Sequence, residues 1–469
     1  MTALRPYQAD AVARLRAAYA AGARAPLLVL PTGGGKTIIF SHICAGAVAR
    51  GRRALVLVHR RELIRQASAK LHAAGVAHGI VAPGFSPTRD PIQVASVQTL
   101  GRRLARSAAR GVDLIVIDEA HHAAAGTWRR IVDAFPGARL LGVTATPERL
   151  DGKGLGVAAG GPFDLLVDGP GIGELVRLGF LVPAEVYAPA ETPDLSGARV
   201  RAGDWARDDL EAAVDRPQVV GCAVEHYARF CPGLPAIAFC VSVRHAQDVA
   251  ARFSAAGWRA AAVDGGMPAA ARDRAIAGLA DGSVQVLASC DLISEGLDVP
   301  AVGAVILMRP TQSLGLHLQQ VGRGLRPAPG KTRLIVLDHA GNTLRHGLPD
   351  APRSWSLDGA APRRRADAPK LPALRRCPAC FALHPPIAAC PVCGHEHLRE
   401  AREVAEVSGE LARLDEARLA AMRAAPLREL LRHARSDADL RAIAQARGYR
   451  PGWVWHVKRE RAARREATA

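Results

Sequence analysis

The segment PLLVLPTGGGKT, residues 26–37, decides the expected fold of this 469-residue chain. A short apolar run leads into a loop that contains Gly33, Gly34 and Gly35, and a helical pattern starts at Lys36. Such loops bind phosphate, because glycine lets backbone amides approach the oxygens and the helix N-terminus is electropositive. The segment therefore predicts a parallel α/β domain with a nucleotide at the carboxyl end of its strand.

The residues of this phosphate loop, 31–37, each have an expected task. Lys36 should reach the β- and γ-phosphates of ATP, and the Thr37 hydroxyl should be a ligand of Mg²⁺. Thr32 and the three glycines should line the phosphate site. The general pattern begins with Gly, whereas this chain has Leu30 there, so a plain glycine-rich turn before a helix stays as the alternative.

A second apolar run, LIVIDEAHH at 114–122, ends in two adjacent carboxylates. We expect Asp118 to hold Mg²⁺ and Glu119 to orient or deprotonate the attacking water, with the phosphate loop on a neighbouring strand. A solvated turn is the alternative. His121 and His122 follow, and each taken alone is more typical of a polar turn than of a functional site.

Similar apolar runs recur and alternate with helical patterns, as in a parallel sheet that is covered on both faces. The runs form two groups, 26–35, 54–59, 113–121 and 140–147, and then 236–242, 260–265, 284–290, 304–310 and 333–341. Two α/β domains in series are therefore expected. The expected organisation is a first domain at 1–160, a connecting region at 161–215, a second domain at 216–345, a linker at 346–374, a four-cysteine module at 375–398 and a basic tail at 399–469.

The net charge of +18 favours a polyanionic partner over a merely basic surface. Most of the basic residues are arginine, which codon bias can explain, although such bias does not explain the excess of basic over acidic residues. Hydrophobic residues make up 49% and charged residues 23% of the chain. No apolar run approaches the ~20 residues of a membrane span and no signal peptide is evident, so we expect a cytoplasmic protein without membrane contact.

Two Cys-x-x-Cys pairs lie in CPACFALHPPIAACPVCGHEH, residues 377–397. Cys377, Cys380, Cys390 and Cys393 can surround a structural Zn²⁺, because paired thiols in a reducing compartment are more often metal ligands than disulfides. A redox pair, a disulfide and a nearby histidine ligand are the alternatives.

The end of the chain, RGYRPGWVWHVKRERAARR at 447–465, alternates basic and aromatic residues. We expect Arg450, Trp455, Lys458 and Arg459 to contact nucleic acid, because cations follow the phosphates and aromatic rings stack on bases. A small helical pair whose aromatic residues pack its own core is the alternative.

Taken in chain order, the motifs resemble those of the superfamily 2 DEAD/DEAH-box helicases over residues 4–345. The matching segments are LRPYQ (4–8), PTGGGKT (31–37), LVLVHRRELIRQ (55–66), VASVQTL (94–100), DEAH (118–121), TATP (144–147), ASCDLISEGLDVP (288–300) and QQVGRGLRP (319–327). The resemblance implies an α/β chain of two tandem RecA-like parallel-sheet domains with ATP between them, followed by a small zinc-binding module and a basic, mainly helical tail.

The resemblance also implies roles for residues outside the phosphate loop. The second domain would supply Gln319, Arg323 and Arg326, and two arginines three residues apart share one helix face. Both could stabilise charge on the γ-phosphate. Asp298 would contact the ribose or these arginines, and Gln8 would bind adenine.

Further roles follow from the same motifs. Arg5 would stack on the adenine ring. His121, Thr144 and Thr146 would couple hydrolysis to strand movement. The strand backbone would be bound by Arg60, Arg61 and Gln66, since phosphate contacts give affinity without sequence specificity.

Within the superfamily, the segment 319–342 followed by a Cys-x-x-Cys module resembles the bacterial RadD-type DNA-repair helicases and their phage relatives. The expected function is an ATP-dependent helicase or translocase on single-stranded, forked or branched DNA, in repair or recombination. An RNA-dependent ATPase is one alternative. An ATP-gated DNA-binding or recruitment factor that does not unwind is another.

Overall fold

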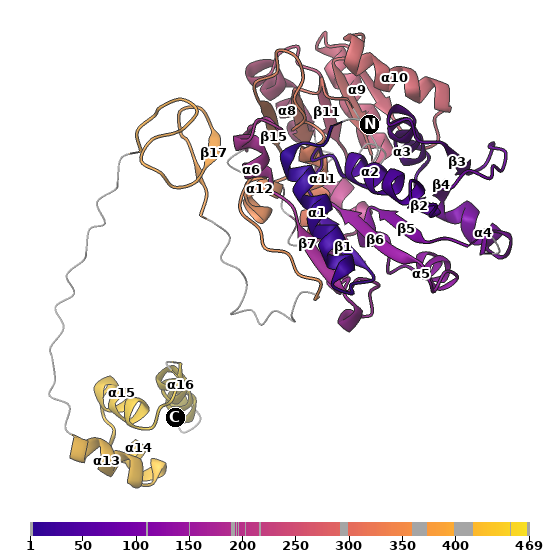
Figure 1. Cartoon of the computed structure of the whole chain (residues 1–469). Coiled ribbons are helices and arrows are strands. Elements are labelled where there is room, and N and C mark those ends of the chain that lie inside the picture. Colours follow the sequence, from indigo (N-terminus) through magenta and orange to yellow (C-terminus); the bar gives the residue numbers. More distant parts are fainter. Residues whose placement is uncertain are drawn as a thin grey trace. The chain divides into compact units, whose positions relative to one another are not determined.

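The computed structural model describes most of the chain. The described residues are 3–108, 111–149, 151–188, 193, 195, 197–201, 203–214, 217–290, 299–358, 373–397, 416–450 and 452–466. The chain forms two compact units, Met1–Leu398 and Arg399–Ala469 (Figure 1).

The first sheet lies early in unit Met1–Leu398. Within the described residues it has seven parallel strands in the order β3-β4-β2-β5-β6-β1-β7. Their bounds are β1 Pro26–Val29, β2 Ala54–Val58, β3 His78–Val81, β4 Ile92–Ser96, β5 Leu114–Asp118, β6 Arg139–Thr144 and β7 Leu165–Asp168. The strand β6 lies between β1 and β5, so the expectation that the phosphate loop and Asp118 follow neighbouring strands is wrong.

The second sheet has eight strands in the described residues, in the order β12-β13-β11-β14-β15-β8-β17-β16. The strands from β12 to β8 are parallel, and β17 and β16 are antiparallel additions at one edge. The bounds are β8 Ala184–Tyr187, β11 Ala236–Phe239, β12 Ala260–Val263, β13 Val286–Ser289, β14 Ala304–Leu307, β15 Leu334–Asp338, β16 Arg375–Arg376 and β17 Ala382–His384. The two parallel-sheet domains agree with the expected α/β class.

Helices cover both faces of each sheet, as short apolar strands require. Their bounds are α1 Pro6–Ala20, α2 Lys36–Val48, α3 Arg61–Ala73, α4 Val97–Ala108, α5 Gly126–Asp133, α6 Ile172–Arg177, α7 Arg207–Val214, α8 Pro217–Phe230, α9 Val243–Ala255, α10 Ala269–Asp281, α11 Leu314–Gly322 and α12 Asn342–His346. Two 3₁₀ turns, Ala120–His122 and Val157–Ala159, and a short hairpin of β9 Val200–Arg201 with β10 Asp204–Trp205 complete this unit.

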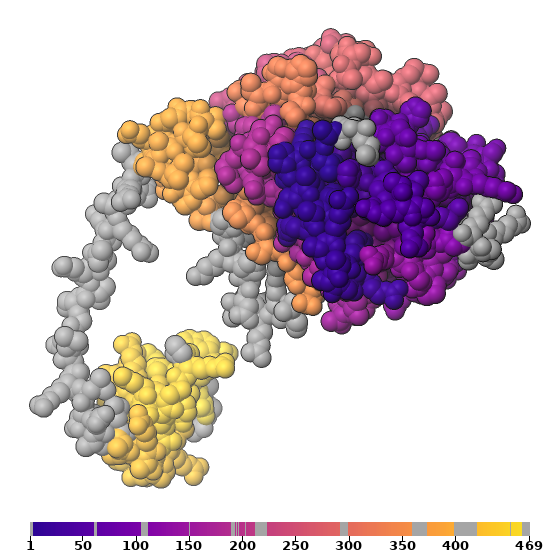
Figure 2. Space-filling view, in the orientation of Figure 1, coloured from indigo at the N-terminus to yellow at the C-terminus, as the bar shows by residue number. Residues whose placement is uncertain are grey.

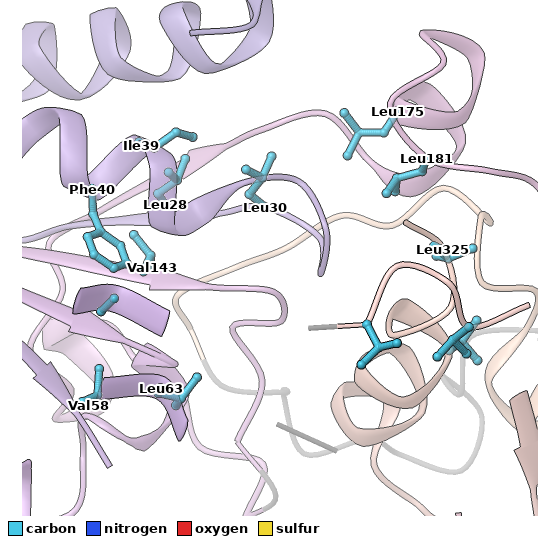
Figure 3. Close-up of a cluster of buried hydrophobic side chains, with 14 of the residues drawn as sticks. Leu28, Leu30, Ile39, Phe40, Val58, Leu63, Val143, Leu175, Leu181 and Leu325 are labelled. Atoms are coloured by element: carbon cyan, nitrogen blue, oxygen red, sulfur yellow. The ribbon is translucent and has the colours of Figure 1, made fainter. Parts of the chain in front are cut away.

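The hydrophobic core runs through both domains. Helices α1 to α3 cover one face of the first sheet, and α4 and α5 cover the other. The cluster on the α1 to α3 side continues into the second domain, and Figure 3 labels members from both parts, such as Leu28 and Phe40 in the first and Leu325 in the second. Leu175 and Leu181, from the segment between the domains, belong to the same cluster. This continuous apolar packing places the two domains side by side.

The unit Arg399–Ala469 is helical in its described part. It contains α13 Glu416–Ala424, α14 Leu427–His433, α15 Asp437–Ala446 and α16 Trp453–Glu466. Leu440 and Ile443 are buried at its centre, and Trp453 packs against them. The Ser436 hydroxyl accepts a bond from the Asp439 amide, and the Asp439 side chain accepts one from the Ser436 amide, which together cap α15. Among the helices of the described residues, none combines the length and apolar character needed to cross a membrane.

Candidate nucleotide site between the two domains

The phosphate loop joins β1 to α2 at the carboxyl edge of the first sheet. Gly35 caps α2 in a left-handed conformation with φ 86°, which a glycine adopts without strain. The Lys36 ammonium donates to the Leu30 carbonyl at 3.1 Å, which holds the side chain back along the loop. Leu30 therefore fits the fold although the general motif has glycine there, because its side chain is fully buried in the core.

The N-terminus of α1 is bonded to this loop. The Tyr7 hydroxyl donates to the Gly34 carbonyl at 2.8 Å, and Gln8 Nε2 donates to the same oxygen at 3.3 Å. The Arg5 guanidinium lies 4.5 Å from the centre of the Phe180 ring. Gln8 thus stands beside the loop, and Arg5 packs on the Phe180 ring. Tyr7 and Phe180 were not predicted, because a tyrosine before Gln8 and a phenylalanine far along the chain carry no motif of their own.

The two carboxylates at the end of β5 differ in backbone geometry. Asp118 is the last residue of the strand, and its Oδ1 accepts a bond from the Glu119 amide at 3.0 Å. Glu119 is left-handed at φ 51° and ψ 56°, which costs a residue other than glycine about 1 kcal/mol or more. Its buried Oε2 has no hydrogen-bond partner within the described part of the chain. A buried carboxylate oxygen of this kind, on a residue whose backbone is strained, can accept a hydrogen bond from a bound water.

A polar chain connects Glu119 to the end of β6. His121 Nδ1 lies 3.6 Å from Glu119 Oε2 and 3.2 Å from Thr144 Oγ1. The Thr144 hydroxyl donates to the Thr146 carbonyl at 2.8 Å and accepts from the Thr146 amide at 3.2 Å. Thr144 and Thr146 are buried. The structure thus brings the three predicted coupling residues together, because β6 ends between β5 and β1.

The second domain approaches the phosphate loop through α11. A Cβ built on Gly322 would lie 2.6 Å from Thr32 Cβ, so a larger residue could not stand at this crossing. A Cβ built on Gly33 would lie 3.3 Å from Arg326 Cγ. Gln319, on the same helix, is buried. Because α11 ends at Gly322, Arg323 stands at its cap and Arg326 in the loop beyond, so the expectation that the two arginines share one helix face is wrong. Outside the core, the Arg65 guanidinium on α3 contacts the Asp273 carboxylate on α10 at 3.0 Å, which is a second link between the domains.

Charges of both signs meet at Lys36. Burial lowers the pKa of Lys36, the Glu119 and Asp118 carboxylates raise it, and Arg323 and Arg326 lower it. Burial also lowers the pKa of Arg326. A lysine, two arginines and two carboxylates in one water-poor cleft can accommodate a polyphosphate with a divalent cation, because the cation completes the neutralisation. The residues present therefore fit ATP and Mg²⁺.

A cavity of about 890 Å³ opens between the domains on the far side of His121. Arg60, His121 and Thr146 line it from the first domain, and Arg309 and Gln319 line it from the second. The predicted strand contact Arg60 therefore faces this cavity.

The other predicted contacts do not all reach the same cavity. Gln66, on α3, is half-buried and is not among the residues that line it. The side chain of Arg61 and the whole of Asp298 lie outside the described residues.

One wall of this cavity could not be predicted from the sequence. The buried carboxylate of Asp204, on β10, accepts bonds from Thr311 Oγ1 and the Gln312 amide, both at 2.8 Å, and lies 3.6 Å from the Arg309 guanidinium. These contacts attach the hairpin to the second domain across more than 100 residues. A single aspartate in a stretch of mixed glycine and charge cannot be recognised from sequence.

Lys331 is a second residue that the motifs do not identify. Its ammonium donates to the carbonyls of Gly324 at 2.6 Å and Arg326 at 2.8 Å. The same group donates to the carbonyls of Pro300 at 3.1 Å and Val302 at 2.5 Å. Lys331 therefore connects the segment that carries Arg326 to the segment that follows residue 298.

The four cysteines of the module lie together. Their Sγ atoms are all within 4.8 Å of one another, and the pairs Cys377–Cys393 and Cys380–Cys390 are each 3.6 Å apart. A tetrahedron with Zn–S bonds of ~2.3 Å has edges of about 3.8 Å, whereas a disulfide needs about 2.05 Å. Desolvation raises the pKa of Cys377, but hydrogen bonds from the backbone amides of Cys380 and Ala379 and with the Cys393 and Cys380 thiols together lower it to about 6, whereas desolvation raises the pKa of Cys380 to about 12. The set fits Zn²⁺.

The four-cysteine module, expected at 375–398 after a linker, contributes a strand to the sheet of the second domain. Its β17 pairs antiparallel with β8, with Ala382 opposite Tyr187 and Leu383 opposite Val186. Figure 2 shows the module in light orange against the magenta part of the chain that includes β8.

The predicted contacts of the tail lie on its surface, Arg450 between α15 and α16 and the other three on α16. Arg450, Lys458 and Arg459 are exposed, and Trp455 is 57% exposed. The Arg459 guanidinium lies 5.2 Å from the Trp455 ring, and Lys458 pairs with Asp437 at 2.7 Å. Trp453 instead packs inward. The alternative of an aromatic residue that packs the core of this unit thus applies to Trp453, whereas Trp455 is on the surface.

Comparison with known families divides the chain as the two sheets do. Residues 1–149 match the family model ResIII, described as the type III restriction enzyme res subunit. Residues 225–328 match the helicase conserved C-terminal domain.

Two curated relatives match over most of the chain. A 51.5 kDa protein of a Lactococcus phage is 32% identical over 384 residues, which is 81% of this chain and 80% of the phage protein. A Saccharomyces cerevisiae protein named as an ATP-dependent helicase, IRC3, is 31% identical over 72% of this chain. The chain spans about half of this yeast relative, 51% of its length.

Among solved structures, a fragment assigned as the HsdR subunit of a type I restriction enzyme from Vibrio vulnificus superposes with a TM-score of 0.59. The match covers 74% of this chain and 66% of the fragment at 22% identity, so the likeness concerns the fold. With both family models and the phage and yeast relatives, the chain belongs to the superfamily 2 helicases, a family of nucleic-acid-dependent ATPases.

Proposed function

We propose that the chain is a motor that hydrolyses ATP between its two α/β domains and thereby moves along DNA. The observation that carries this proposal is the convergence on Lys36 of two carboxylates from the first domain and two arginines from the second. Hydrolysis that needs groups from both domains requires the domains to close. Closure then depends on the nucleotide state, which is the physical basis of a motor.

The first domain would bind ATP and Mg²⁺ and would activate the attacking water. The amides of Gly33, Gly34 and Gly35 and the Lys36 ammonium hold the phosphates, and Thr37 with Asp118 holds Mg²⁺. When bound, Mg²⁺ neutralises phosphate charge. Glu119 orients the attacking water and accepts its proton, because its Oε2 is buried and has no other hydrogen-bond partner in the described structure. Thr32 lines the phosphate site.

The second domain would complete the site. Arg323, at the C-terminal cap of α11, and Arg326, in the loop that follows, stabilise charge that develops on the γ-phosphate, and Gln319 on α11 positions the phosphate. Asp298 binds the ribose or the arginines. Gln8 reads adenine once its amide turns away from Gly34, and Arg5 covers the ring.

Coupling would pass through the chain His121, Thr144 and Thr146. It starts beside Glu119 and ends at the wall of the 890 Å³ cavity, where Arg60 faces the strand path. Loss of the γ-phosphate can change the bonds at Glu119 and hence the wall that contacts the strand. Arg61 and Gln66 would follow the strand along α3, and the tail residues Arg450, Trp455, Lys458 and Arg459 would add affinity.

DNA is favoured as the strand by two observations. The net charge of +18 suits a polyanion, and residues 1–149 match a family model described as a restriction enzyme subunit, a class that acts on DNA. The four-cysteine module behind the motor supports the RadD-type assignment and a role in DNA repair or recombination. An unpaired, forked or branched substrate fits a motor that follows one strand.

The module would hold one structural Zn²⁺, bound by Cys377, Cys380, Cys390 and Cys393. A module as small as residues 375–398, built around four thiolates, folds only with its metal. We expect about one zinc per chain by atomic emission, and the double substitution Cys377→Ser with Cys380→Ser should lose it. A metal-free protein with normal ATPase and DNA binding would contradict this assignment.

The decisive experiment measures the ATPase rate with single-stranded, duplex and forked DNA and with RNA on one preparation. Single-stranded or forked DNA should stimulate the rate, and Lys36→Ala should abolish it while the exposed control Lys153→Ala behaves as wild type. A rate indifferent to every nucleic acid would sink the proposal, and stimulation by RNA alone would favour an RNA-dependent ATPase. Nucleotide-dependent affinity without triplex displacement would favour a recruitment factor.

A further inference from the structure

A second cavity, of about 290 Å³, lies where the four-cysteine module meets the second domain, away from the nucleotide site. Its walls come from β8, α8 and β15 on one side and from the module on the other. The lining includes Tyr187, His226, Arg229, Phe230, Arg376 and Phe381. This volume is near the lower limit of small-ligand pockets and suits a single nucleotide unit.

Among the described residues, two arginines and no carboxylate line the cavity, although the Glu185 carboxylate accepts a bond from the hydroxyl of the lining residue Tyr187 at 3.2 Å. The arginines are Arg229 and Arg376, and no ion pair joins either guanidinium to an acid in the described part of the chain. His226 and His339 also line it, and burial lowers the pKa of both, that of His339 to about 3. Two guanidiniums beside neutral imidazoles are suited to a phosphate, which arginine binds with paired donors.

Aromatic faces line the same space. The Arg229 and Arg376 guanidiniums lie 5.2 and 5.4 Å from the centre of the Phe381 ring. Phe230 stacks on Tyr187 with ring centres 4.3 Å apart and planes 22° apart. Aromatic rings beside arginines are the combination that holds the bases of single strands.

Phe381 stands where the local fold favours glycine. The module has two equivalent turns, CPACF at 377–381 and CPVCG at 390–394, and the fifth residue of each is left-handed. Gly394 has φ 74°, and Phe381 has φ 66°, a conformation that strains a bulky side chain. The first turn thus has a strained phenylalanine at the position where the second turn has an unstrained glycine. The Phe381 ring faces the cavity.

We propose that this cavity binds one unpaired nucleotide of a nucleic-acid strand, with the base against Phe381 and Phe230 and the phosphate on Arg229 and Arg376. The inference rests on the proposed function, because the strand is the one that the motor follows. It assigns the module a contact with that strand outside the cleft between the domains. A free mononucleotide has the same chemistry and is distinguished by the test.

Phe381→Gly is the sharpest variant, because glycine suits φ 66° and the turn should keep its fold and its zinc. Affinity for a fluorescein-labelled 15-mer of deoxythymidine should fall about 5- to 100-fold at constant salt, as expected for one stacked base. The matched control is Ile387→Gly in the same module, since Ile387 is 44% exposed and does not line the cavity. Zinc content of both variants should equal that of wild type.

Two further measurements locate the contact. Arg229→Ala should lower the slope of log affinity against log salt by about one, because one phosphate contact is lost. Cross-linking with a 15-mer that contains 5-iodouracil should map to peptides with Phe381, Phe230 or Tyr187.

The outcomes separate the two proposals. If Phe381→Gly and Arg229→Ala bind the 15-mer as wild type does while DNA still stimulates ATP hydrolysis, this inference is wrong and the motor proposal stands. If wild type binds no strand at all, the motor proposal fails. Thymidine monophosphate binding that Phe381→Gly abolishes, with 15-mer binding unchanged, would overturn the strand assignment in favour of a free nucleotide.

Discussion

The segments LIVIDEAHH at 114–122 and LIVLDHAGN at 334–342 begin alike, and both end a buried strand in an aspartate. In the second domain, Asp338 accepts bonds from the amides of Ala340, Asn342 and Thr343, at 3.2, 3.1 and 2.6 Å, so its carboxylate caps the turn after β15. In the first domain, Asp118 accepts the Glu119 amide and lies beside Lys36.

The two domains therefore use one strand ending for different purposes. The left-handed Glu119 directs the chain after β5 away from Asp118, whereas the chain after β15 folds back onto Asp338. The first domain presents its acids to the cleft, and the second presents cations from α11 and the loop that follows. A strand-end aspartate thus predicts a ligand only when the following residues leave its oxygens accessible.

Four predictions test whether the first domain supplies the acids and the second domain the cations of the nucleotide site.

The largest effect should follow from removing a cation of the second domain. Arg326→Ala should lower the DNA-stimulated kcat by about 10³- to 10⁵-fold, because an arginine on the γ-phosphate acts mainly in the transition state. Binding of a fluorescent ATP analogue should change little. A matched loss of ATP binding would show that Arg326 belongs to the binding half of the site. The exposed Arg333→Ala is the control.

The next effect concerns the acid of the first domain. Glu119→Gln should lower kcat by about 10²- to 10⁴-fold and retain ATP and DNA binding, because glutamine fills the same space but cannot accept the proton. Single-turnover hydrolysis followed by phosphate release measures the step. A variant with wild-type kcat would remove Glu119 from the chemistry.

Comparing Asp338→Asn with Asp118→Asn tests most directly whether the two strand-end aspartates have different roles. Asp338→Asn should lower the free energy of unfolding by about 1–3 kcal/mol, because an amide nitrogen would face a buried N–H donor. Urea denaturation measures this loss, and the folded fraction should keep its ATPase rate. Asp118→Asn should do the opposite, with stability near wild type and no ATPase. Equal behaviour of the two variants would contradict the distinction.

The smallest effect should come from Lys331, which holds the loop of Arg326. Burial and the neighbouring Arg326 lower the pKa of Lys331 to about 8. As the pH rises through 8 the ammonium loses a donor to its four carbonyls, so kcat should fall a few-fold between pH 7 and 9. The Lys331→Met variant should have a low kcat that does not change with pH over this range. A wild-type kcat that does not decline between pH 7 and 9 would argue against a role of Lys331 in holding the Arg326 loop.

The titration of Lys331 should change the stability of the protein in the direction opposite to its effect on kcat. The folded pKa of Lys331 lies below its ordinary value of 10.5, so the unfolded chain binds more protons between these two values. This group therefore raises the free energy of unfolding as the pH rises through that window. Activity and stability should move in opposite directions, which separates an effect on the loop from general unfolding.

Much of the molecule was predictable from local patterns. The short apolar runs indicated parallel sheets covered by helices, the order of the motifs indicated the family, and the spacing of two Cys-x-x-Cys pairs indicated a four-thiol cluster. These features are local because strand burial, phosphate binding by a loop and a metal-binding turn each depend on residues within one short segment.

Tertiary packing decided which of those segments meet. The position of β6 between β1 and β5 brings His121 to Thr144, Asp204 bonds to a loop more than 100 residues later, and β17 joins the edge of the second sheet. The same packing separates the ligand-like Asp118 from the structural Asp338, and brings Arg229 and Arg376 close to the Phe381 ring. Such contacts join residues whose separation along the chain leaves no periodicity or spacing to recognise, because burial and hydrogen bonding select them only once the sheets have formed.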